Sequence, residues 1–220
     1  MTLTNDGPAP TGDEDGPAPA PRRISYWIPV ALVVGLILGA VIGFVVPRGA
    51  SLPADDSPEA GFARDMTTHH TQAVEMGLVA FVRAQNPDVR SMAVDIALNQ
   101  QGQIGMMQAW LREWKLQPTR SEPPMAWMPG GEQSVVNGLM PGMATQAELK
   151  QLNEATGLDE DRLFLKLMIQ HHLGGVHMAQ EVLKLSDDQE VVEAAQLTIN
   201  SQQRELTDMK SLQQQIEAAA

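Results

Sequence analysis

Apolar residues recur at helical spacing over most of the chain, and no segment shows the alternation of a β-strand. Ser57 followed by Pro58 is typical of a helix start, with the serine as N-cap and the proline in the first turn. An Asn-Pro pair at 86–87 repeats this signal. The pattern therefore predicts two helices, over 58–84 and 87–114, that follow each other as a hairpin.

A long connection, 115–157, follows the first hairpin and is rich in Pro, Gly and Met. Near its end, Thr145 and Glu148 have the spacing of a capping box, in which each residue satisfies a backbone N–H of the other. A short helix is expected to begin there and to end by Gly157, because glycine commonly terminates helices.

A second hairpin is expected after this connection. Asp159 is predicted to cap a helix that reaches about residue 185, and residues 186–189 to form a capping box for a last helix that runs to the C-terminus. The fold class predicted is all-α: an antiparallel, ferritin-like four-helix bundle of two similar hairpins. Its parts are hairpin 1 (58–114), the connection with its short helix (115–157) and hairpin 2 (159–218), together 58–220.

The N-terminal region has a different composition. Residues 1–23 are rich in Pro, Gly, Ala and Asp with little to bury, which predicts a disordered tail. Residues 27–46 contain no charged side chain, and a helix of that length covers roughly the 30 Å hydrocarbon core of a bilayer. We therefore expect a transmembrane helix over 24–47, followed by a linker, 48–57.

The flanking charges favour one membrane topology. Two arginines at 22–23 precede the apolar segment and Arg48 follows it, a slight bias toward a cytoplasmic N-terminus. The prediction is a single-pass protein of the cell membrane with its C-terminal domain outside. Gly35, Gly39 and Gly43 form a small-residue ridge that is expected either to pair two such helices in a homodimer or to reflect the abundance of glycine in membrane helices.

One motif occurs twice in the predicted bundle, at a constant offset (from residue 69 to residue 171, for example). Such self-similarity indicates two copies of one structural unit. Its first copy contains Met66, His69, His70 and Met76, and its second contains Met168, His171, His172 and Met178. On a helix, a methionine three or four residues before a histidine shares its face, so each copy can offer a thioether and an imidazole to one ion.

Imidazole and thioether without thiolate form a donor set that suits copper better than zinc. The sequence therefore predicts that this protein binds copper, as Cu(I) or Cu(II), with the eight methionines and histidines of the repeat as candidate ligands. Further candidates on the same or facing helices are His177, Gln101, Met107, Gln203 and Met209. The alternative is that the histidines are structural groups of the core and that the 13 methionines fill its gaps.

Two further features narrow the possible functions. The net charge of −12 argues against binding to nucleic-acid phosphates. The absence of cysteine excludes disulfides, thiolate metal sites and cysteine nucleophiles.

The connection carries two Met-x-x-Met sequences, at 125–128 and 140–143, and we interpret them as residues that pack the connection onto the bundle.

The duplicated motif resembles the domain of unknown function 305 family, which includes CopM-like secreted copper-binding proteins. The resemblance rests on the two Met-x-x-His-His motifs, on Gln101-x-x-Ile104-x-x-Met107 and on the sequence at 140–145, and it covers about 61–212. It implies a ferritin-like four-helix bundle, export or membrane tethering, and copper binding and tolerance. The first copy departs from the family in having Thr67-Thr68 before its histidines.

Three functions remain in competition. The leading hypothesis is a membrane-anchored, extracytoplasmic protein without catalytic activity that binds copper for sequestration, tolerance or transfer. A ferritin-like oxidase is the second, although the Glu-x-x-His motif of di-iron bundles is missing from the sequence. The third is a structural or partner-binding bundle that binds no metal.

Overall fold

The computed structural model describes residues 52–120 and 122–219, which form an all-helical unit with no β-strand. Its elements are α2 (Pro58–Arg83), α3 (Pro87–Glu113), the 3₁₀ helix η1 (Gly131–Ser134), α4 (Gln146–Glu154), α5 (Leu158–Leu185) and α6 (Gln189–Ala218). Within this part of the chain, none of the helices has the length and apolar character needed to cross a membrane. The predicted tail and transmembrane segment lie outside the described residues.

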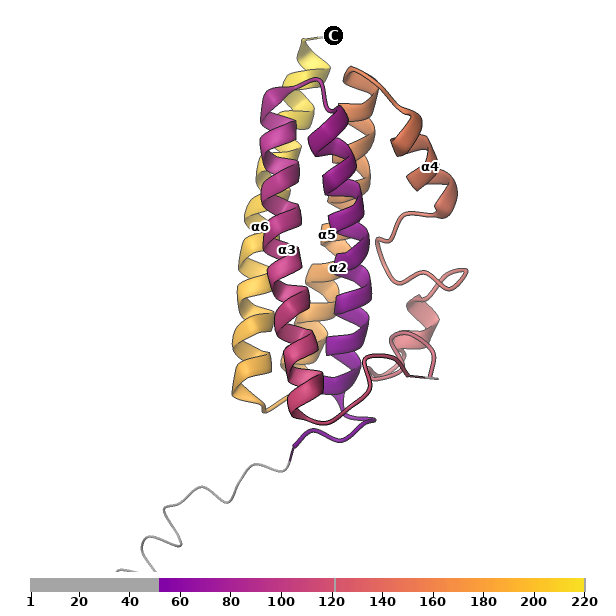
Figure 1. Cartoon of the computed structure of the whole chain (residues 1–220), viewed down its shortest axis with the longest axis vertical. Helices are drawn as coiled ribbons and strands as arrows, with labels where there is room; N and C mark the ends of the chain where they lie inside the picture. The colour runs from indigo at the N-terminus through magenta and orange to yellow at the C-terminus, as the bar shows by residue number, and fades with distance from the viewer. Residues whose placement is uncertain (1–51, 121, 220) are drawn as a thin grey trace, which may run out of the picture. The chain divides into compact units, whose positions relative to one another are not determined.

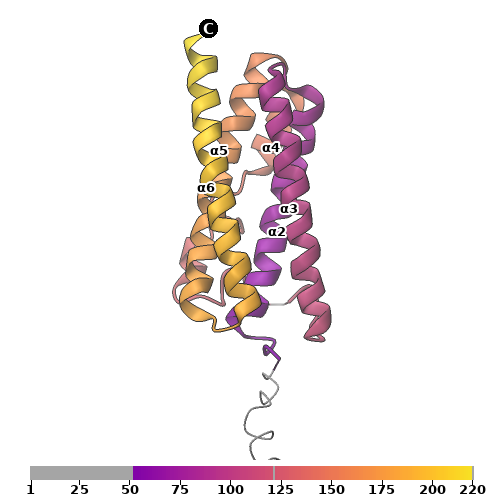
Figure 2. The same cartoon turned by 90° about the vertical axis from the view of Figure 1, so that its left-hand side faces the viewer.

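The four long helices run side by side as a helical bundle (Figure 1). Helix α2 forms an antiparallel hairpin with α3, and α5 forms one with α6, as predicted. The view turned by 90° shows the two hairpins packed against each other, with the C-terminal end of α6 at the end of the bundle where the α2–α3 turn lies (Figure 2). The short helix α4 lies outside the bundle, beside α2 and α5.

The helix ends follow the local signals at most positions. The Ser57 side chain accepts the N–H of Ala60, and the capping box of Thr145 and Glu148 is present. The third long helix differs from the prediction, because it begins at Leu158 after Gly157, whose φ of 65° favours glycine. Asp159 is thus not its cap: the carboxylate lies in the first turn and accepts a hydrogen bond from Arg162.

The last helix also begins differently from the prediction. Asp188, and not Ser186, is its N-cap, because the Asp188 carboxylate accepts the N–H groups of Glu190 and Val191. The Ser186 hydroxyl instead accepts the N–H of Asp188. The predicted capping box at 186–189 is therefore replaced by an aspartate cap of the same kind as Asn86 before α3.

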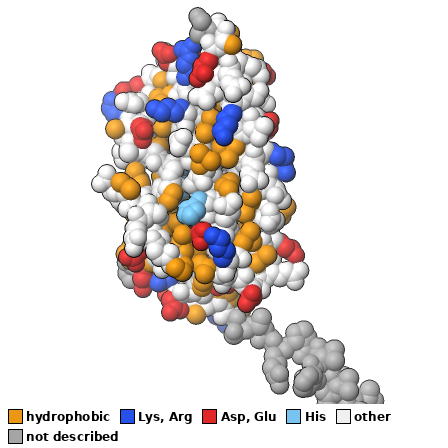
Figure 3. All heavy atoms as spheres, turned by 180° about the vertical axis from the view of Figure 1, so that it is seen from behind, with side chains coloured by type: hydrophobic (Ala, Val, Ile, Leu, Met, Phe, Trp, Pro, Cys, Tyr) orange, Lys and Arg blue, Asp and Glu red, His pale blue; other side chains and the backbone are white. Residues whose placement is uncertain are grey.

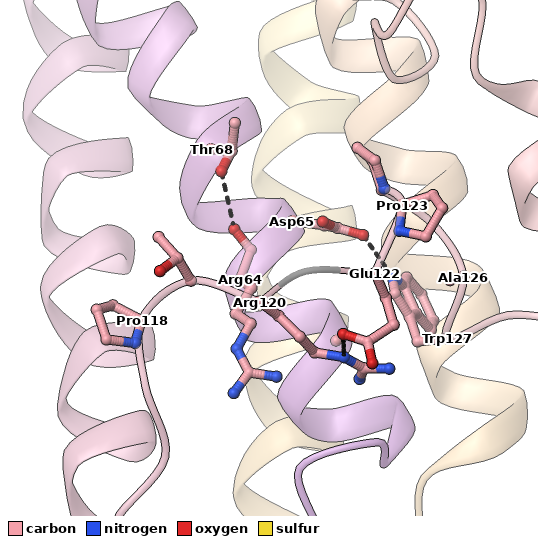
Figure 4. Close-up of a pocket in the computed structure, with 12 residues that line it drawn as sticks. Arg64, Asp65, Thr68, Pro118, Arg120, Glu122, Pro123, Ala126 and Trp127 are labelled. Carbon is pink, nitrogen blue, oxygen red and sulfur yellow. Dashed lines mark hydrogen bonds and ion pairs between the residues drawn. The ribbon is translucent and has the colours of Figure 1, made fainter.

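The connection between the hairpins is anchored to α2. The Asp65 carboxylate accepts a hydrogen bond from the backbone N–H of Met125, at 2.7 Å. It also accepts one from the indole N–H of Trp127, at 2.9 Å (Figure 4). Beside this anchor lies a pocket of about 250 Å³, where Arg64 and Arg120 both donate to the Asp55 carbonyl. Arg64 also donates to the Gln117 carbonyl, at 2.9 Å, so both arginines tie the connection to α2 and to the segment before it.

The apolar residues form two clusters along the bundle. One cluster contains Met66, Met107 and Met178 together with methionines and Trp127 of the connection. The other contains Met76, Met168 and Met209. The methionines at 125, 128 and 140 are buried, which confirms that the two Met-x-x-Met sequences pack the connection onto the bundle. Along α2 and along α5, the histidine pair lies between a methionine of one cluster and a methionine of the other.

Candidate functional site

Four histidines meet in the middle of the bundle. His69 and His70 come from α2 and His171 and His172 from α5, and all four side chains are fully buried. The rings of His69 and His171 lie against each other, with centroids 3.8 Å apart and planes 36° apart. We call these four residues the histidine layer.

Three of these rings are held by an acceptor on Nε2. His69 Nε2 lies 3.1 Å from the carbonyl oxygen of Pro141, in the connection. His70 Nε2 lies 2.7 Å from Gln103 Oε1 on α3, and His172 Nε2 lies 2.7 Å from Glu205 Oε2 on α6. Because each partner atom is an acceptor, each neutral ring carries its proton on Nε2 and its lone pair on Nδ1.

The two acceptors are themselves joined by Asn99 on α3. The Asn99 amide nitrogen donates to Glu205 Oε1 at 3.2 Å, and its oxygen accepts from the Gln103 amide at 3.4 Å. A hydroxyl, that of Thr198, also donates to Gln103 Oε1, at 3.0 Å. A continuous network thus runs from His70 to His172 through all four long helices, and it fixes the orientation of both rings.

Burial favours the neutral form of three of these imidazoles, those of His69, His70 and His171. Loss of solvation lowers the pKa of His69 to about 3 and that of His70 to about 4, with the neighbouring histidines adding to the effect for His69. Burial likewise lowers the pKa of His171 well below its ordinary value. Burial alone raises the pKa of Glu205, but hydrogen bonds from His172 and Asn99 outweigh it and hold that pKa below its ordinary value.

The free nitrogens of the layer are suited to a cation. Nδ1 of His69, His70 and His172 and both nitrogens of His171 are buried without a hydrogen-bond partner among the described residues. A neutral imidazole whose other nitrogen donates to a carbonyl or a carboxylate is the usual form of a histidine metal ligand. The donors present therefore fit a copper ion.

The rings do not, however, converge on one point in this arrangement. Imidazole binds a metal along the lone pair in its ring plane, so two stacked rings such as His69 and His171 do not point at a common ion. Among the described residues, no three His, Asp or Glu side chains are placed to hold one metal ion together. The layer thus offers separate nitrogens, each to be completed by other donors.

The thioethers of the repeat lie on both sides of the histidine layer. Met66 and Met178, from different copies, belong to one apolar cluster, and Met76 and Met168 belong to the other. All four are buried. Since α2 and α5 run in opposite directions, each side of the layer receives one methionine from each copy. Thioether donors on either side are therefore shared between the two hairpins.

Three of the additional candidates do not face the histidine layer. Gln101 and Gln203 are exposed on the outer sides of their helices. His177 is partly exposed and its Nδ1 lies 4.0 Å from Glu181 Oε1; histidine is visible on the surface in Figure 3. Met107 and Met209 are buried, one in each apolar cluster.

The inward-facing polar residues of α3 and α6 lie one or two positions from the glutamines that the sequence suggested. Gln103 and Glu205 hold the rings, while Gln100 and Gln202 are buried and their amide groups have no hydrogen-bond partner among the described residues. Both pairs have the same offset as the repeated histidines, which is the signal that points to them. Successive side chains on a helix point about 100° apart, so of two neighbouring glutamines only one faces the core.

The connection closes one side of the layer. A Cβ atom on Gly174 of α5 would lie 1.8 Å from the Pro141 oxygen, and one on Gly142 would lie 2.2 Å from the Gln170 oxygen. The Gln72 amide exchanges two hydrogen bonds with the backbone of Ala144, at 2.7 and 2.9 Å. Close backbone contact with α5 and a side-chain clamp from α2 thus position the carbonyl that holds His69.

The comparisons with known proteins agree with this architecture. The model of the family "Domain of unknown function (DUF305)" matches residues 59–213. A putative secreted DUF305 protein from Streptomyces coelicolor is 41% identical, with a TM-score of 0.68, over 74% of this chain and 96% of that one. No curated protein matches.

CopM is also among the similar solved structures. Its Cu(II)-bound form is 29% identical, with a TM-score of 0.56, over 72% of this chain and 97% of that chain. Its Cu(I)-bound form is 25% identical, with a TM-score of 0.56, over 72% and 96%. The similar solved structures thus include one described as a putative secreted protein and one with bound copper.

Proposed function

We propose that this chain, which belongs to the family of the domain of unknown function DUF305, binds copper ions without catalysing a reaction. The ligands would be Nδ1 atoms of the histidine layer, completed by thioethers from Met66, Met76, Met168 and Met178. The protein would sequester copper or pass it on. Copper bound to CopM and the soft donor set of this chain both support the proposal.

One observation carries this proposal. Three buried imidazoles donate Nε2–H to fixed acceptors and keep buried Nδ1 atoms without a hydrogen-bond partner among the described residues. A purely structural histidine core would not be expected to contain such unpartnered Nδ1 atoms, because leaving a buried polar atom without a partner costs about 1–3 kcal/mol. A bound cation would satisfy these atoms.

The scaffold and location belong to the same proposal. The four-helix bundle would be ferritin-like, and the apolar segment at 24–47 would tether it to the outer side of the cell membrane. The secreted description of the Streptomyces coelicolor protein supports this side of the membrane. Thioethers and imidazoles also suit an oxidising compartment, since neither forms disulfides.

A copper titration tests the proposal. The full chain, purified in mild detergent, is titrated with Cu(I) and Cu(II) against competing chelators, with Zn(II) in parallel. We expect tight, stoichiometric copper binding and weak zinc binding. Replacing His70 and His172 together with alanine should lower the copper affinity by at least about tenfold, the lower bound for disturbing a metal ligand or its support.

The matched control is His177→Ala, which removes a partly exposed histidine next to Glu181. It should leave copper affinity within about twofold, because a change of that size is small on the scale of a lost ligand. Copper binding no stronger than background, or binding unchanged in the double variant, would overturn the proposal in favour of a structural or partner-binding bundle.

A further inference from the structure

The duplication is broken at the residues that hold the two outer rings. His70 and His172 are equivalent positions of the repeat, and each has its partner 33 residues further along the chain, at the same distance of 2.7 Å. In the first copy the partner is the neutral amide of Gln103. In the second copy it is the carboxylate of Glu205, the one acid hydrogen-bonded to the histidine layer within the described residues.

The surface next to Glu205 is also lined by acidic residues. Glu205 reaches a groove of about 460 Å³ between α3 and α6, which is also lined by Asp95 and Asp208. Glu205 therefore contacts both the solvent-accessible groove and the buried ring of His172. In this half of the bundle, a cation would therefore meet negative charge both at the surface and beside the histidine.

Three of the four acids that line this groove have no acidic equivalent in the other half, whereas Asp88, Ser91 and Gln215 of the groove correspond to Glu190, Glu193 and Glu113. By the offset of the repeat, Glu205, Asp208 and Asp95 correspond to Gln103, Met106 and Leu197. Met106 and Leu197 are both exposed, with 37% and 67% of their surface accessible. At these three positions the other half thus has an amide, a thioether and an aliphatic side chain, and of these the Gln103 amide contacts His70.

We infer that the two halves of the histidine layer are selective for different charge states of the ion: the His172–Glu205 half for divalent copper and the His70–Gln103 half for monovalent copper. This inference rests on the proposed copper binding and adds to it a division of labour between the two copies. The Asn99 bridge, which contacts both Gln103 and Glu205, links the halves.

The physical reason is the charge of the partner. At equal distance, the Glu205 carboxylate attracts a divalent ion twice as strongly as a monovalent one, whereas the Gln103 amide offers only a dipole. A carboxylate that accepts Nε2–H also makes Nδ1 of its ring a stronger donor. Thioethers such as Met106 favour the soft monovalent ion, and acidic oxygens favour the harder divalent ion.

Exchanging the two partners tests this inference. Glu205→Gln gives the second copy the partner of the first, and Gln103→Glu does the reverse, so each variant has a native precedent in the same fold. Affinities for Cu(II) and Cu(I) are measured on the full chain in detergent by chelator competition, and Cu(II) ligation by electron paramagnetic resonance. Glu217→Gln on an exposed part of α6 is the control.

We expect Glu205→Gln to weaken Cu(II) binding by about 10- to 100-fold while Cu(I) affinity changes by less than about threefold. Gln103→Glu should add Cu(II) affinity, and the control should change neither. Equal losses for both ions in Glu205→Gln, or unchanged Cu(II) binding in both variants, would overturn the inference and leave copper binding itself in place. Failure of the wild-type protein to bind either ion would remove the proposed function and this inference with it.

Discussion

At the residue scale, the buried histidines are unusual because hydrogen bonds fix three of their rings. Each of these three rings has one acceptor and one nitrogen without a hydrogen-bond partner among the described residues. Since burial lowers the pKa of His69 and His70, these two imidazoles stay unprotonated over the whole neutral range, and a metal need not displace a proton from their Nδ1 atoms.

This state of the rings is observable by NMR. Because the folded pKa values of about 3 and about 4 lie below the unfolded value of 6.5, the folded state binds fewer protons than the unfolded state between them. Their stabilising contribution is complete above pH 6.5 and is lost as the pH falls toward 4. We expect ring ¹⁵N shifts of neutral Nε2–H tautomers at pH 5. Protonated rings at pH 5 would contradict the prediction; the urea-unfolded chain is the reference.

Glu160 is another buried titratable residue, in the first turn of α5, the helix that also carries His171 and His172. It has no exposed surface, and its carboxyl oxygens have no hydrogen-bond partner in the described part of the chain. Burial, with the charge of Asp161, raises its pKa to about 7, and Arg83 only partly opposes this. The contribution of Glu160 to stability is therefore largest below pH 4.5 and is lost as the pH rises through about 7.

Glu160→Gln should remove this loss of folding stability at high pH. At pH 8 the variant is expected to be more stable than wild type by about 2 kcal/mol, and the difference should vanish near pH 4. Urea unfolding at the two pH values measures it, with the exposed Glu217→Gln as control. A difference that is independent of pH would show that packing, and not ionisation, is affected.

At the element scale, the connection between the hairpins is held by local close contacts. Gly174 has no Cβ and so allows the Pro141 carbonyl to reach α5 and, beyond it, His69. Gly102 on α3 has open space around it. These two helical glycines therefore have different roles, which their sequence context alone does not distinguish.

Gly174→Ala should displace the connection and destabilise the protein by about 1–3 kcal/mol, the range for overpacking. Gly102→Ala should stabilise it by about 0.5–1 kcal/mol, because alanine favours the helix. Denaturant unfolding gives both values, and the ring resonances of His69 should shift only in the first variant. Similar effects from the two substitutions would mean that the connection does not need this contact.

At the scale of the whole molecule, the two hairpins are joined at the end where α5 begins. The buried carboxylate of Asp161 accepts the backbone N–H groups of Gln85 and Asn86, in the turn between α2 and α3, at 2.9 and 3.0 Å. Asp159, two residues earlier, is exposed and forms an ion pair with Arg162 of its own helix. Of the three consecutive acids at 159–161, Asp161 thus connects the hairpins.

Asp161→Ala should cost about 2–4 kcal/mol, because it leaves two N–H groups of the turn without their acceptor. Asp159→Ala should change stability by less than about 0.5 kcal/mol, as is usual for an exposed ion pair. Guanidinium unfolding of both variants makes the comparison. Equal effects would show that the turn is held by its apolar neighbours instead.

Much of the fold could be predicted from local signals. Ser57, Asn86 and Thr145 mark helix starts because capping depends on residues a few positions apart. The local sequence does not identify the start of α5, because Asp159 and Gly157 are both plausible caps and the contact of Asp161 with the other hairpin favours Gly157. Boundaries that depend on a distant contact are not readable from the local sequence.

The sequence by itself determined the repeat, the helical periodicity and the pairing of methionine with histidine, because these are relations along one helix. Tertiary structure decided which side chains from other helices meet the histidines. It brought Met66 to the side of Met178, since α2 and α5 are antiparallel, and it turned Gln103 and Glu205, but not Gln101 and Gln203, toward the rings. Moving one position along a helix turns the side-chain direction by about 100°, so it changes which neighbouring residues a side chain contacts, and only packing fixes how each helix is rotated in the bundle.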